Sequence, residues 1–213
     1  MLPEDMKFFD PRAEIGFSKN RLPHWQQEGA VYFVTFRLAD SVPRHLLRQW
    51  NEEKEVWRRL HPPPWTEANE REYHARFSAA MERWLDAGHG ACVLREPACA
   101  GIIAEVLRHF EGERCTQWAW VVMPTHMHGV FTVRTGHTLE ALLHSWKLFS
   151  ARRINALNGK TGRLWQKDYF DRLVRDAEHF ARCVRYIRRN PVKAGLRAGE
   201  FLLWESERAR EVV

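Results

Sequence analysis

The stretch from residue 117 to residue 133 constrains the fold most, because it consists of two apolar runs rich in β-branched and aromatic residues. Pro124 separates the two runs, and proline ends a strand more often than it continues one. We therefore predict two strands joined by a short connection. Side chains alternate between the two faces of a strand, so His126 and His128 should project from one face and Met127 from the other.

Two neutral imidazoles on one face of a strand form half of a metal site. An isolated His-x-His pattern is otherwise typical of two surface histidines at the entrance of a strand. Here the pair lies in an apolar strand, and candidate partner residues follow later in the chain. This setting favours metal binding.

Alternating and helical periodicities elsewhere predict a mixed α and β domain. A strand is expected over residues 31–38, and a second, shorter strand within residues 162–174. Helices are expected over residues 96–111, 138–157 and 176–189, the last of them ending before a proline.

The regions around this domain have a different composition. Residues 44–90, approximately, combine helical periodicity with a break of three prolines, which predicts a helical hairpin inserted into the domain. Residues 1–29 are expected to form an irregular arm. The domain should then extend over residues 1–197, followed by a charged tail at residues 198–213.

Several absences guide the expected location. No apolar run approaches the roughly 18–20 residues that span a bilayer, and the first residues lack the pattern of an export signal. The four cysteines lack Cys-x-x-Cys spacing, which favours buried thiols in a reducing compartment. We expect a cytoplasmic protein without a membrane partner.

Positive charge is concentrated in one quarter of the chain. Residues 147–197 hold fourteen Lys and Arg but four Asp and Glu, an excess of ten, whereas the whole chain has a formal net charge of +6. Aromatic residues are interleaved with these cations, a combination that suits a nucleic acid with stackable bases. The alternative is a solvated helical surface whose arginines pair locally.

The helix expected over residues 176–189 carries an unusual tyrosine. Its apolar stripe has helical spacing and consists of Phe180, Cys183, Val184 and Ile187. Tyr186 lies off this stripe, and Asn190 follows four residues later on the same flank. The alternative reading is a partly exposed tyrosine that packs among the neighbouring arginines.

Three segments together resemble a known family. They are Pro-Thr-His-Met-His-Gly-Val, Leu-Trp-Gln-Lys-Asp-Tyr-Phe-Asp-Arg and Arg-Tyr-Ile-Arg-Arg-Asn-Pro-Val-Lys-Ala-Gly. They are similar to the single-tyrosine transposases of the HUH endonuclease superfamily, and more narrowly to the REP-associated tyrosine transposases, which are linked to repetitive extragenic palindromes. The resemblance covers roughly residues 20–197, and the helical insertion is similar to that of longer members.

The resemblance implies an α+β fold: a central antiparallel sheet of four to five strands with flanking helices, related to the ferredoxin-like arrangement, plus the helical hairpin insertion. It implies that His126, His128 and Asn190 bind Mg²⁺ or Mn²⁺ and that Tyr186 is the nucleophile. Single-stranded or hairpin DNA would be cleaved through a 5′-phosphotyrosine, by a nucleoid-associated monomer or homodimer. Imidazole ligands favour Mn²⁺ in vitro.

Basic and aromatic residues near these motifs are expected to contact DNA, with the helices over 138–157 and 176–189 flanking the metal face. The candidates are Lys147, Arg152, Arg153, Trp165, Lys167, Tyr169, Arg182, Arg189 and Lys193.

Other readings remain open. Tyr169 is the main rival nucleophile, because it lies within one of the motifs, whereas Tyr32 lies on the apolar face of its strand and Tyr73 in the insertion. The protein could also bind hairpin DNA or RNA without cleaving it. A third reading is a hydrolytic metal nuclease without a covalent step.

Overall fold

The computed structural model describes residues 6–19, 23–62 and 65–212. Contacts divide the chain into two units, Met1–Ala39 with Val93–Val213, and Asp40–Cys92. Parts of the expected N-terminal arm and of the proline-rich break, including Pro63 and Pro64, lie outside the described residues.

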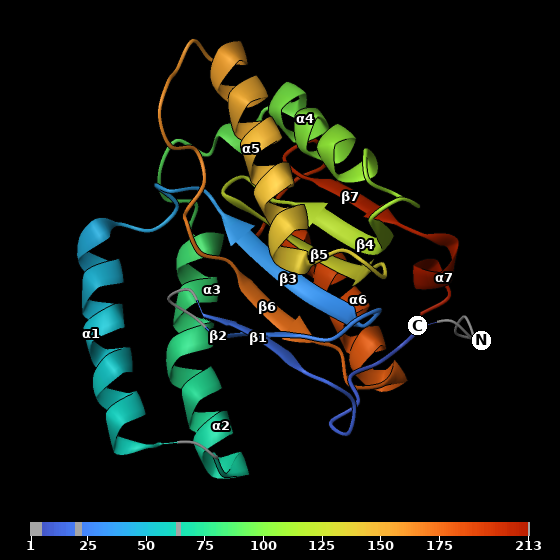
Figure 1. Cartoon of the computed structure of the whole chain (residues 1–213). Coiled ribbons are helices and arrows are strands. Elements are labelled where there is room, and N and C mark those ends of the chain that lie inside the picture. The colour runs from blue at the N-terminus through green and yellow to red at the C-terminus, as the bar shows by residue number, and fades with distance from the viewer. Residues whose placement is uncertain (1–5, 20–22, 63–64, 213) are drawn as a thin grey trace. The chain divides into compact units, whose positions relative to one another are not determined.

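A five-stranded antiparallel sheet forms the centre of the first unit, within the described residues (Figure 1). In spatial order its strands are β6 (Phe170–Leu173), β3 (Val31–Arg37), β5 (His126–Val133), β4 (Cys115–Val122) and β7 (Leu202–Glu205). Without the helices of the second unit, the chain order is β3, one α-helix, β4, β5, one α-helix and β6, which is the β-α-β-β-α-β order of the ferredoxin-like arrangement. The predicted α+β fold is confirmed.

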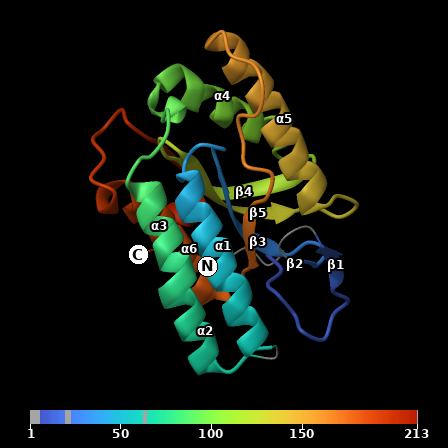
Figure 2. The ribbon, with the colours of Figure 1, turned by 90° about the vertical axis from the view of Figure 1, so that its left-hand side faces the viewer.

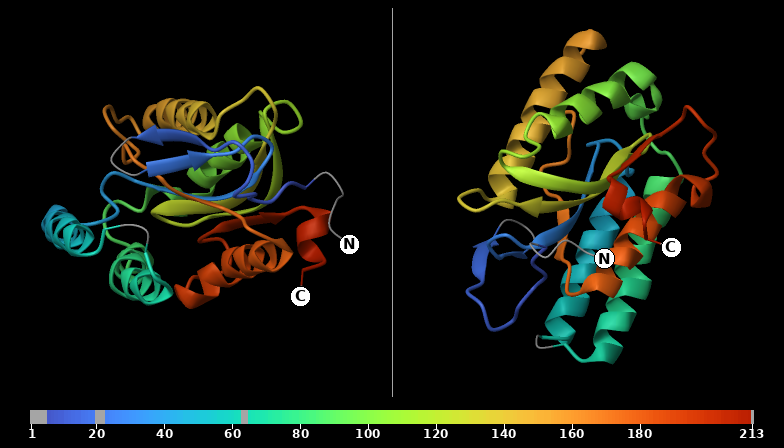
Figure 3. Two further views of the ribbon diagram at one scale, coloured as in Figure 1. Left: turned by 60° about the horizontal axis from the view of Figure 1, so that its bottom comes forward. Right: turned by 90° about the vertical axis from the view of Figure 1, so that its right-hand side faces the viewer.

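Helices cover both faces of this sheet. α4 (Pro97–Arg108) and α5 (Leu139–Leu157) lie side by side on one face, and α6 (Ala177–Lys193) lies on the other (Figures 2 and 3). Thr138 and Asp176 accept hydrogen bonds from backbone N–H groups in the first turns of α5 and α6. Thr and Asp are among the residue types preferred at this N-cap position.

The alternation of β5 separates two hydrophobic clusters. Met127 and Phe131 pack in the cluster that contains the apolar residues of α4 and α5, and Val130 packs in the cluster of α6. His126 and His128 have the same parity as Val130. Both imidazoles therefore project from the α6 face of the sheet.

α6 continues beyond its predicted end. Residue 189 was the expected last residue because Pro191 follows, but the helix extends to Lys193 with Pro191 inside it and buried. The proline removes one intrahelical donor near the end of the helix, where the cost is small, and the N–H of Leu196 bonds to the Pro191 carbonyl at 2.9 Å. Asn190 consequently keeps helical geometry.

The region expected to be a tail contributes to the sheet. β7 pairs with β4, and the short helix α7 (Glu207–Arg210) follows it. Arg188 of α6 donates to the Glu205 carboxylate at 3.0 Å and to the carbonyls of Ala209 and Val212 at 3.0 and 2.8 Å. A strand of four residues gives little sequence signal, which explains why it was missed.

The N-terminal region contains a small two-stranded sheet, β1 (Gly16–Lys19) with β2 (Pro23–Gln26). Residues on either side of it reach the main sheet, because the N–H of Val31 bonds to the Lys7 carbonyl at 3.1 Å and the N–H of Phe9 to the Val174 carbonyl at 2.9 Å. The irregular arm expected over residues 1–29 therefore contains regular structure.

The second unit is helical, as the sequence predicts for the insertion. It contains α1 (Arg44–Leu60), α2 (Glu67–Tyr73), the π-helical turn His74–Ser78 and α3 (Ala79–Asp86). Trp57 and Phe77 are buried in its own small core, and Trp57 donates to Glu72 at 2.8 Å. Nine Asp and Glu against eight Lys and Arg leave this unit nearly neutral. Within the described residues, every helix is too short or too polar to span a membrane.

Gly129 provides a test of the packing beneath the histidine pair. A Cβ atom there would lie 2.4 Å from the ring of Phe131, which is fully buried and packs on Trp146. We expect Gly129→Ala to lower the free energy of unfolding by about 1–3 kcal/mol, because the ring cannot move without disturbing the core.

Gly101→Ala is the matched control, since a Cβ at this position in α4 meets no atom within 4 Å. It should raise the free energy of unfolding by about 0.5–1 kcal/mol. Chemical denaturation of both variants measures the difference. Equal stabilities would contradict the packing described here.

Candidate active site

The two imidazoles of β5 converge on one point. The Nε2 atom of His126 lies 3.0 Å from the Nε2 atom of His128, and the two rings meet nearly edge to face. Both side chains are almost fully buried, with 1% and 4% of their surface exposed. The sequence-based expectation that the rings share one face of the sheet is confirmed.

Each imidazole has a second hydrogen-bond partner at its Nδ1 atom. Thr125 Oγ1 lies 3.0 Å from Nδ1 of His126, and Thr35 Oγ1 lies 2.6 Å from Nδ1 of His128. Thr35 reaches His128 because the two residues are direct cross-strand partners in the β3–β5 pairing. Both Nε2 atoms are therefore directed toward each other by contacts on the far side of their rings.

Burial keeps both imidazoles neutral. It lowers the pKa of His126 to about 3, and the cation of Arg37 adds to this effect. Burial also lowers the pKa of His128 well below its usual range, with smaller contributions from His126 and Lys193. A neutral imidazole offers a nitrogen lone pair, which is the form that binds metal ions.

Tyr186 of α6 lies beside the histidine pair. Its ring meets the ring of His128 edge-on, with centroids 5.2 Å apart, and it meets Phe33 in the same way at 5.6 Å. Phe33 also stacks on His128 at 5.7 Å. The tyrosine is half-buried, so its ring is held by aromatic neighbours at the border of the solvent.

The other tyrosines of the chain lie elsewhere. Tyr32 and Tyr169 pack in the hydrophobic cluster on the α4–α5 face of the sheet, opposite to the imidazoles. Burial raises the pKa of both phenols. Tyr73 belongs to the helical second unit. Tyr186 is thus the tyrosine that shares a face with His126 and His128.

Asn190 follows Tyr186 by one helical turn and is 1% exposed. Neither its Oδ1 nor its Nδ2 atom has a hydrogen-bond partner. Tyr186, Asn190 and Lys193 have i, i+4, i+7 spacing, so they lie along one side of α6. The Tyr186 ring contacts His128, and the Lys193 cation contributes to the lowered pKa of His128. The Asn190 amide lies between Tyr186 and Lys193 along the helix, so it faces the histidine pair.

These donors fit a divalent ion. If both Nε2 atoms bound one ion at about 2.1 Å, their 3.0 Å separation would correspond to an angle of about 90°, as between neighbouring ligands of an octahedral site. A buried amide oxygen without a partner is a suitable third ligand. Among the described residues, no third His, Cys, Asp or Glu joins the pair, so the amide is the candidate that completes it.

One cation lies beside this site, and a second cation lies near the first. Arg37 is the cross-strand partner of His126, and burial lowers the pKa of its guanidinium to about 10. Lys147 of α5 donates to the Lys167 carbonyl at 2.7 Å, and burial lowers its pKa to about 8, while Asp168 opposes the shift. The charge of Arg37 contributes to the lowered pKa of Lys147, so the two cations lie close enough to repel each other.

The expected DNA-contacting residues are divided by the structure. Trp165 and Tyr169 are buried, and Trp165 packs on Phe36 and donates to Ser150 at 2.9 Å. Neither ring is available for base stacking, so that expectation is not supported. Lys147 is half-buried, and the remaining candidates are exposed: Arg152, Arg153, Lys167, Arg182, Arg189 and Lys193.

The prediction that the helix over 138–157 flanks the metal face is wrong. α5 packs on the opposite face of the sheet, because its apolar residues meet Met127 and Phe131 rather than the histidines. Arg153 of this helix pairs with Glu105 of α4 at 2.6 Å. α6 does lie on the metal face, although its Arg182 pairs with Glu178 at 2.5 Å.

Sequence reasoning missed Thr35, Thr125, Phe33 and Arg37. Phe33, Thr35 and Arg37 alternate along β3 and lie on the same face of the sheet as the histidines, so the period-2 pattern contained a signal for them. What the sequence lacked was the β3–β5 register, which pairs Thr35 with His128 and Arg37 with His126.

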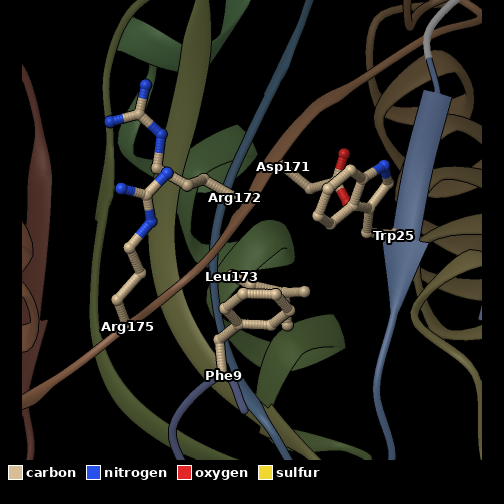
Figure 4. A pocket seen from close by; sticks show the side chains of 6 residues that line it. All are labelled: Phe9, Trp25, Asp171, Arg172, Leu173 and Arg175. Atoms are coloured by element: carbon tan, nitrogen blue, oxygen red, sulfur yellow. The ribbon is translucent and has the colours of Figure 1, made fainter. Parts of the chain in front are cut away.

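A cavity of about 170 Å³ is lined by residues other than the histidine pair, Tyr186 and Asn190. It is lined by Phe9, Trp25, Asp171, Arg172, Leu173 and Arg175 (Figure 4). Figure 4 shows the two arginines extended side by side, while Asp171 and Trp25 lie on the other side of Leu173. None of the histidine or tyrosine groups described above lines it.

Similar proteins of known structure include two transposases. The chain covers 74% of a chain titled as the REP-associated tyrosine transposase bound to a REP hairpin, with 18% identity, a TM-score of 0.45 and 84% of this chain aligned. It covers 98% of a putative transposase from Deinococcus radiodurans R1, with 14% identity, a TM-score of 0.37 and 87% of this chain aligned.

Sequence comparison is more specific. The REP-associated tyrosine transposase of Escherichia coli K12 is 31% identical over 77 residues, which are 36% of this chain and 44% of that protein. The profile of the family described as "Transposase IS200 like" matches residues 95–190. This range contains His126, His128, Tyr186 and Asn190. Residues 95–190, less than half of the chain, are therefore similar to the IS200-like transposases.

Proposed function

We propose that this protein cleaves and rejoins single-stranded DNA at or near palindromic hairpins, through a 5′-phosphotyrosine on Tyr186 and with a divalent metal ion. The observation that carries the proposal is the convergence of the two buried Nε2 atoms at 3.0 Å with the Tyr186 ring packed on one of them. The similarity of residues 95–190 to a transposase family, and the E. coli relative named as a REP-associated tyrosine transposase, support DNA as the substrate.

His126, His128 and Asn190 would hold Mg²⁺ or Mn²⁺. When bound, such an ion polarises a phosphate oxygen and neutralises the charge that grows on it. The neutral imidazoles suit this role, because no proton has to leave them as an ion arrives at neutral pH. Phe33 stacks on His128, and both imidazoles are almost fully buried, which restricts water around the pair.

Tyr186 would supply the nucleophile. Its phenolic oxygen attacks the scissile phosphorus, its proton passes to water, and the bond from phosphorus to the 3′-oxygen breaks. The 3′-oxygen takes up a proton and leaves as a free hydroxyl, while the 5′-phosphate stays on the tyrosine. The new phosphodiester preserves the energy of the old one, so the reverse attack by a 3′-hydroxyl rejoins strands without a nucleotide cofactor.

Tyr186→Phe tests the nucleophile. The ring and its contacts with His128 and Phe33 remain, so binding of a hairpin oligonucleotide should be unchanged, whereas cleavage and the covalent adduct should both disappear. Incubation of the labelled oligonucleotide with Mn²⁺, followed by denaturing electrophoresis, measures both. Removal of the metal with EDTA should abolish both in the unmodified protein.

Tyr169→Phe is the matched control, and it should keep cleavage because this phenol lies on the opposite face of the sheet. Cleavage that survives Tyr186→Phe would refute the assignment. Cleavage by the unmodified protein without an adduct would instead identify a hydrolytic nuclease, and binding without cleavage a hairpin-binding protein.

Asn190→Leu tests the third ligand. If the amide serves a metal ion, it costs stability in the metal-free protein, because its polar atoms are buried without partners. In EDTA the leucine variant should therefore be more stable by about 1–3 kcal/mol. It should also lose the increase in melting temperature that Mn²⁺ gives to the unmodified protein. A variant that is less stable in EDTA and still stabilised by Mn²⁺ would exclude this role.

The lowered pKa of Lys147 predicts that DNA binding depends on pH. With its pKa lowered to about 8, the side chain is a cation below this pH and becomes neutral above it. Raising the pH from 7 to 9 should weaken binding of single-stranded DNA and reduce the salt-dependence slope by about 0.7, the loss of one phosphate contact. In Lys147→Arg the charge persists, so the slope should be the same at both pH values. Parallel pH profiles would show that Lys147 makes no phosphate contact.

A further inference from the structure

Each imidazole of the histidine pair has a threonine hydroxyl at its Nδ1 atom, on the side away from the other ring. The two threonines belong to different segments of the chain. Thr35 lies in the middle of β3, whereas Thr125 directly precedes β5. Their Oγ1 atoms lie 2.6 Å and 3.0 Å from the Nδ1 atoms of His128 and His126. Thr125 is fully buried, and its carbonyl also accepts the N–H of Leu38 at 2.8 Å. The backbone of Thr35 is held by the pairing of β3 with β5, and the backbone of Thr125 by its bond to Leu38.

The chemistry of imidazole decides what such a partner must do. A neutral ring carries one proton, on Nδ1 or on Nε2. Binding a metal ion through Nε2 requires the proton to be on Nδ1, so the group that faces Nδ1 must accept a hydrogen bond. A carbonyl or a carboxylate can only accept, whereas a hydroxyl can accept or donate.

Without an ion between the rings, both capacities are needed. One Nε2 atom then donates to the other across 3.0 Å, so one ring has its proton on Nε2 and the other on Nδ1. The first ring presents a bare Nδ1 atom and needs a donor there. The second ring presents an Nδ1–H group and needs an acceptor. Hydroxyl groups satisfy both rings, whereas a carbonyl or a carboxylate would satisfy only the second.

We propose that Thr35 and Thr125 are the positioning residues of the metal site, and that they let one ring exchange tautomers when an ion binds. This proposal rests on the metal role of His126 and His128 in the proposed function. As the ion arrives, the proton between the rings moves to the Nδ1 atom of its own ring by exchange with water. The facing hydroxyl turns from donor to acceptor, and no net proton is gained or lost.

Thr35→Val and Thr125→Val test the proposal in the full chain. Valine keeps the shape of the side chain and removes the hydroxyl. Each variant should bind Mn²⁺ about 10–100-fold more weakly, measured from free Mn²⁺ by electron paramagnetic resonance without DNA. Thr35→Ser and Thr125→Ser should restore most of the affinity, because they restore the hydroxyl.

Thr132→Val is the matched control. This threonine lies on β5 on the same face, but its hydroxyl accepts from Trp118 at 2.9 Å rather than from an imidazole. Its loss should affect stability while leaving the affinity for Mn²⁺ unchanged. A merely structural role of Thr35 and Thr125 would give the same result for all three valine variants.

Imidazole ¹⁵N spectra give a second readout. The metal-free protein should show one ring with its proton on Nδ1 and one with its proton on Nε2, and both should carry it on Nδ1 with Mg²⁺ bound. Unchanged Mn²⁺ affinity in the valine variants, or one tautomer for both rings without metal, would overturn the proposal alone. An unmodified protein that binds no Mn²⁺ would overturn the proposed metal site and this proposal together.

Discussion

The antiparallel pairing of β3 with β5 is the interaction on which the site depends. The register places Thr35 opposite His128 and Arg37 opposite His126, so a single set of backbone hydrogen bonds fixes both the partners and the charges around the imidazoles. A shift of the register by one residue would move the histidines relative to all of these groups. On the other face of the sheet, Gly129 has no Cβ atom, and the Phe131 ring fills the space that a Cβ atom would occupy.

α6 is the second constraint, and its placement depends on the C-terminal residues. Arg188 links the helix to Glu205 and to two carbonyls near α7, and the Glu205 side chain is only 14% exposed. A partly buried charge pair with further hydrogen bonds is costly to break. Arg188 follows Tyr186 by two residues, so these contacts fix the part of α6 that carries the tyrosine. The last strand therefore supports the site without contributing a residue to it.

Local patterns in the sequence predicted the elements that carry the chemistry. Period-2 alternation put the two histidines on one face, and helical spacing put Tyr186 and Asn190 on one flank, so the core of the candidate site could be assembled before the structure. The threonines behind the imidazoles could not, because they depend on which strand pairs with β5. The burial of Trp165 and Tyr169 could not be predicted from the sequence for a related reason.

Trp165 and Tyr169 lie in a segment that also contains Arg163, Lys167 and Asp168, but their burial depends on the packing of α5.

The two faces of the sheet differ in how their side chains are packed. The α4–α5 face is occupied by close-packed aromatic and aliphatic side chains, including the fully buried Trp120, Trp146 and Phe131, which leaves no room for a substrate. The α6 face interrupts its apolar packing with two histidines, an amide and a half-buried phenol at one end of β5. Buried polar groups of this kind cost stability unless they are paired. The unpaired amide of Asn190 is the strongest sign that this end of the sheet is shaped for a ligand, since packing alone would favour an apolar residue there.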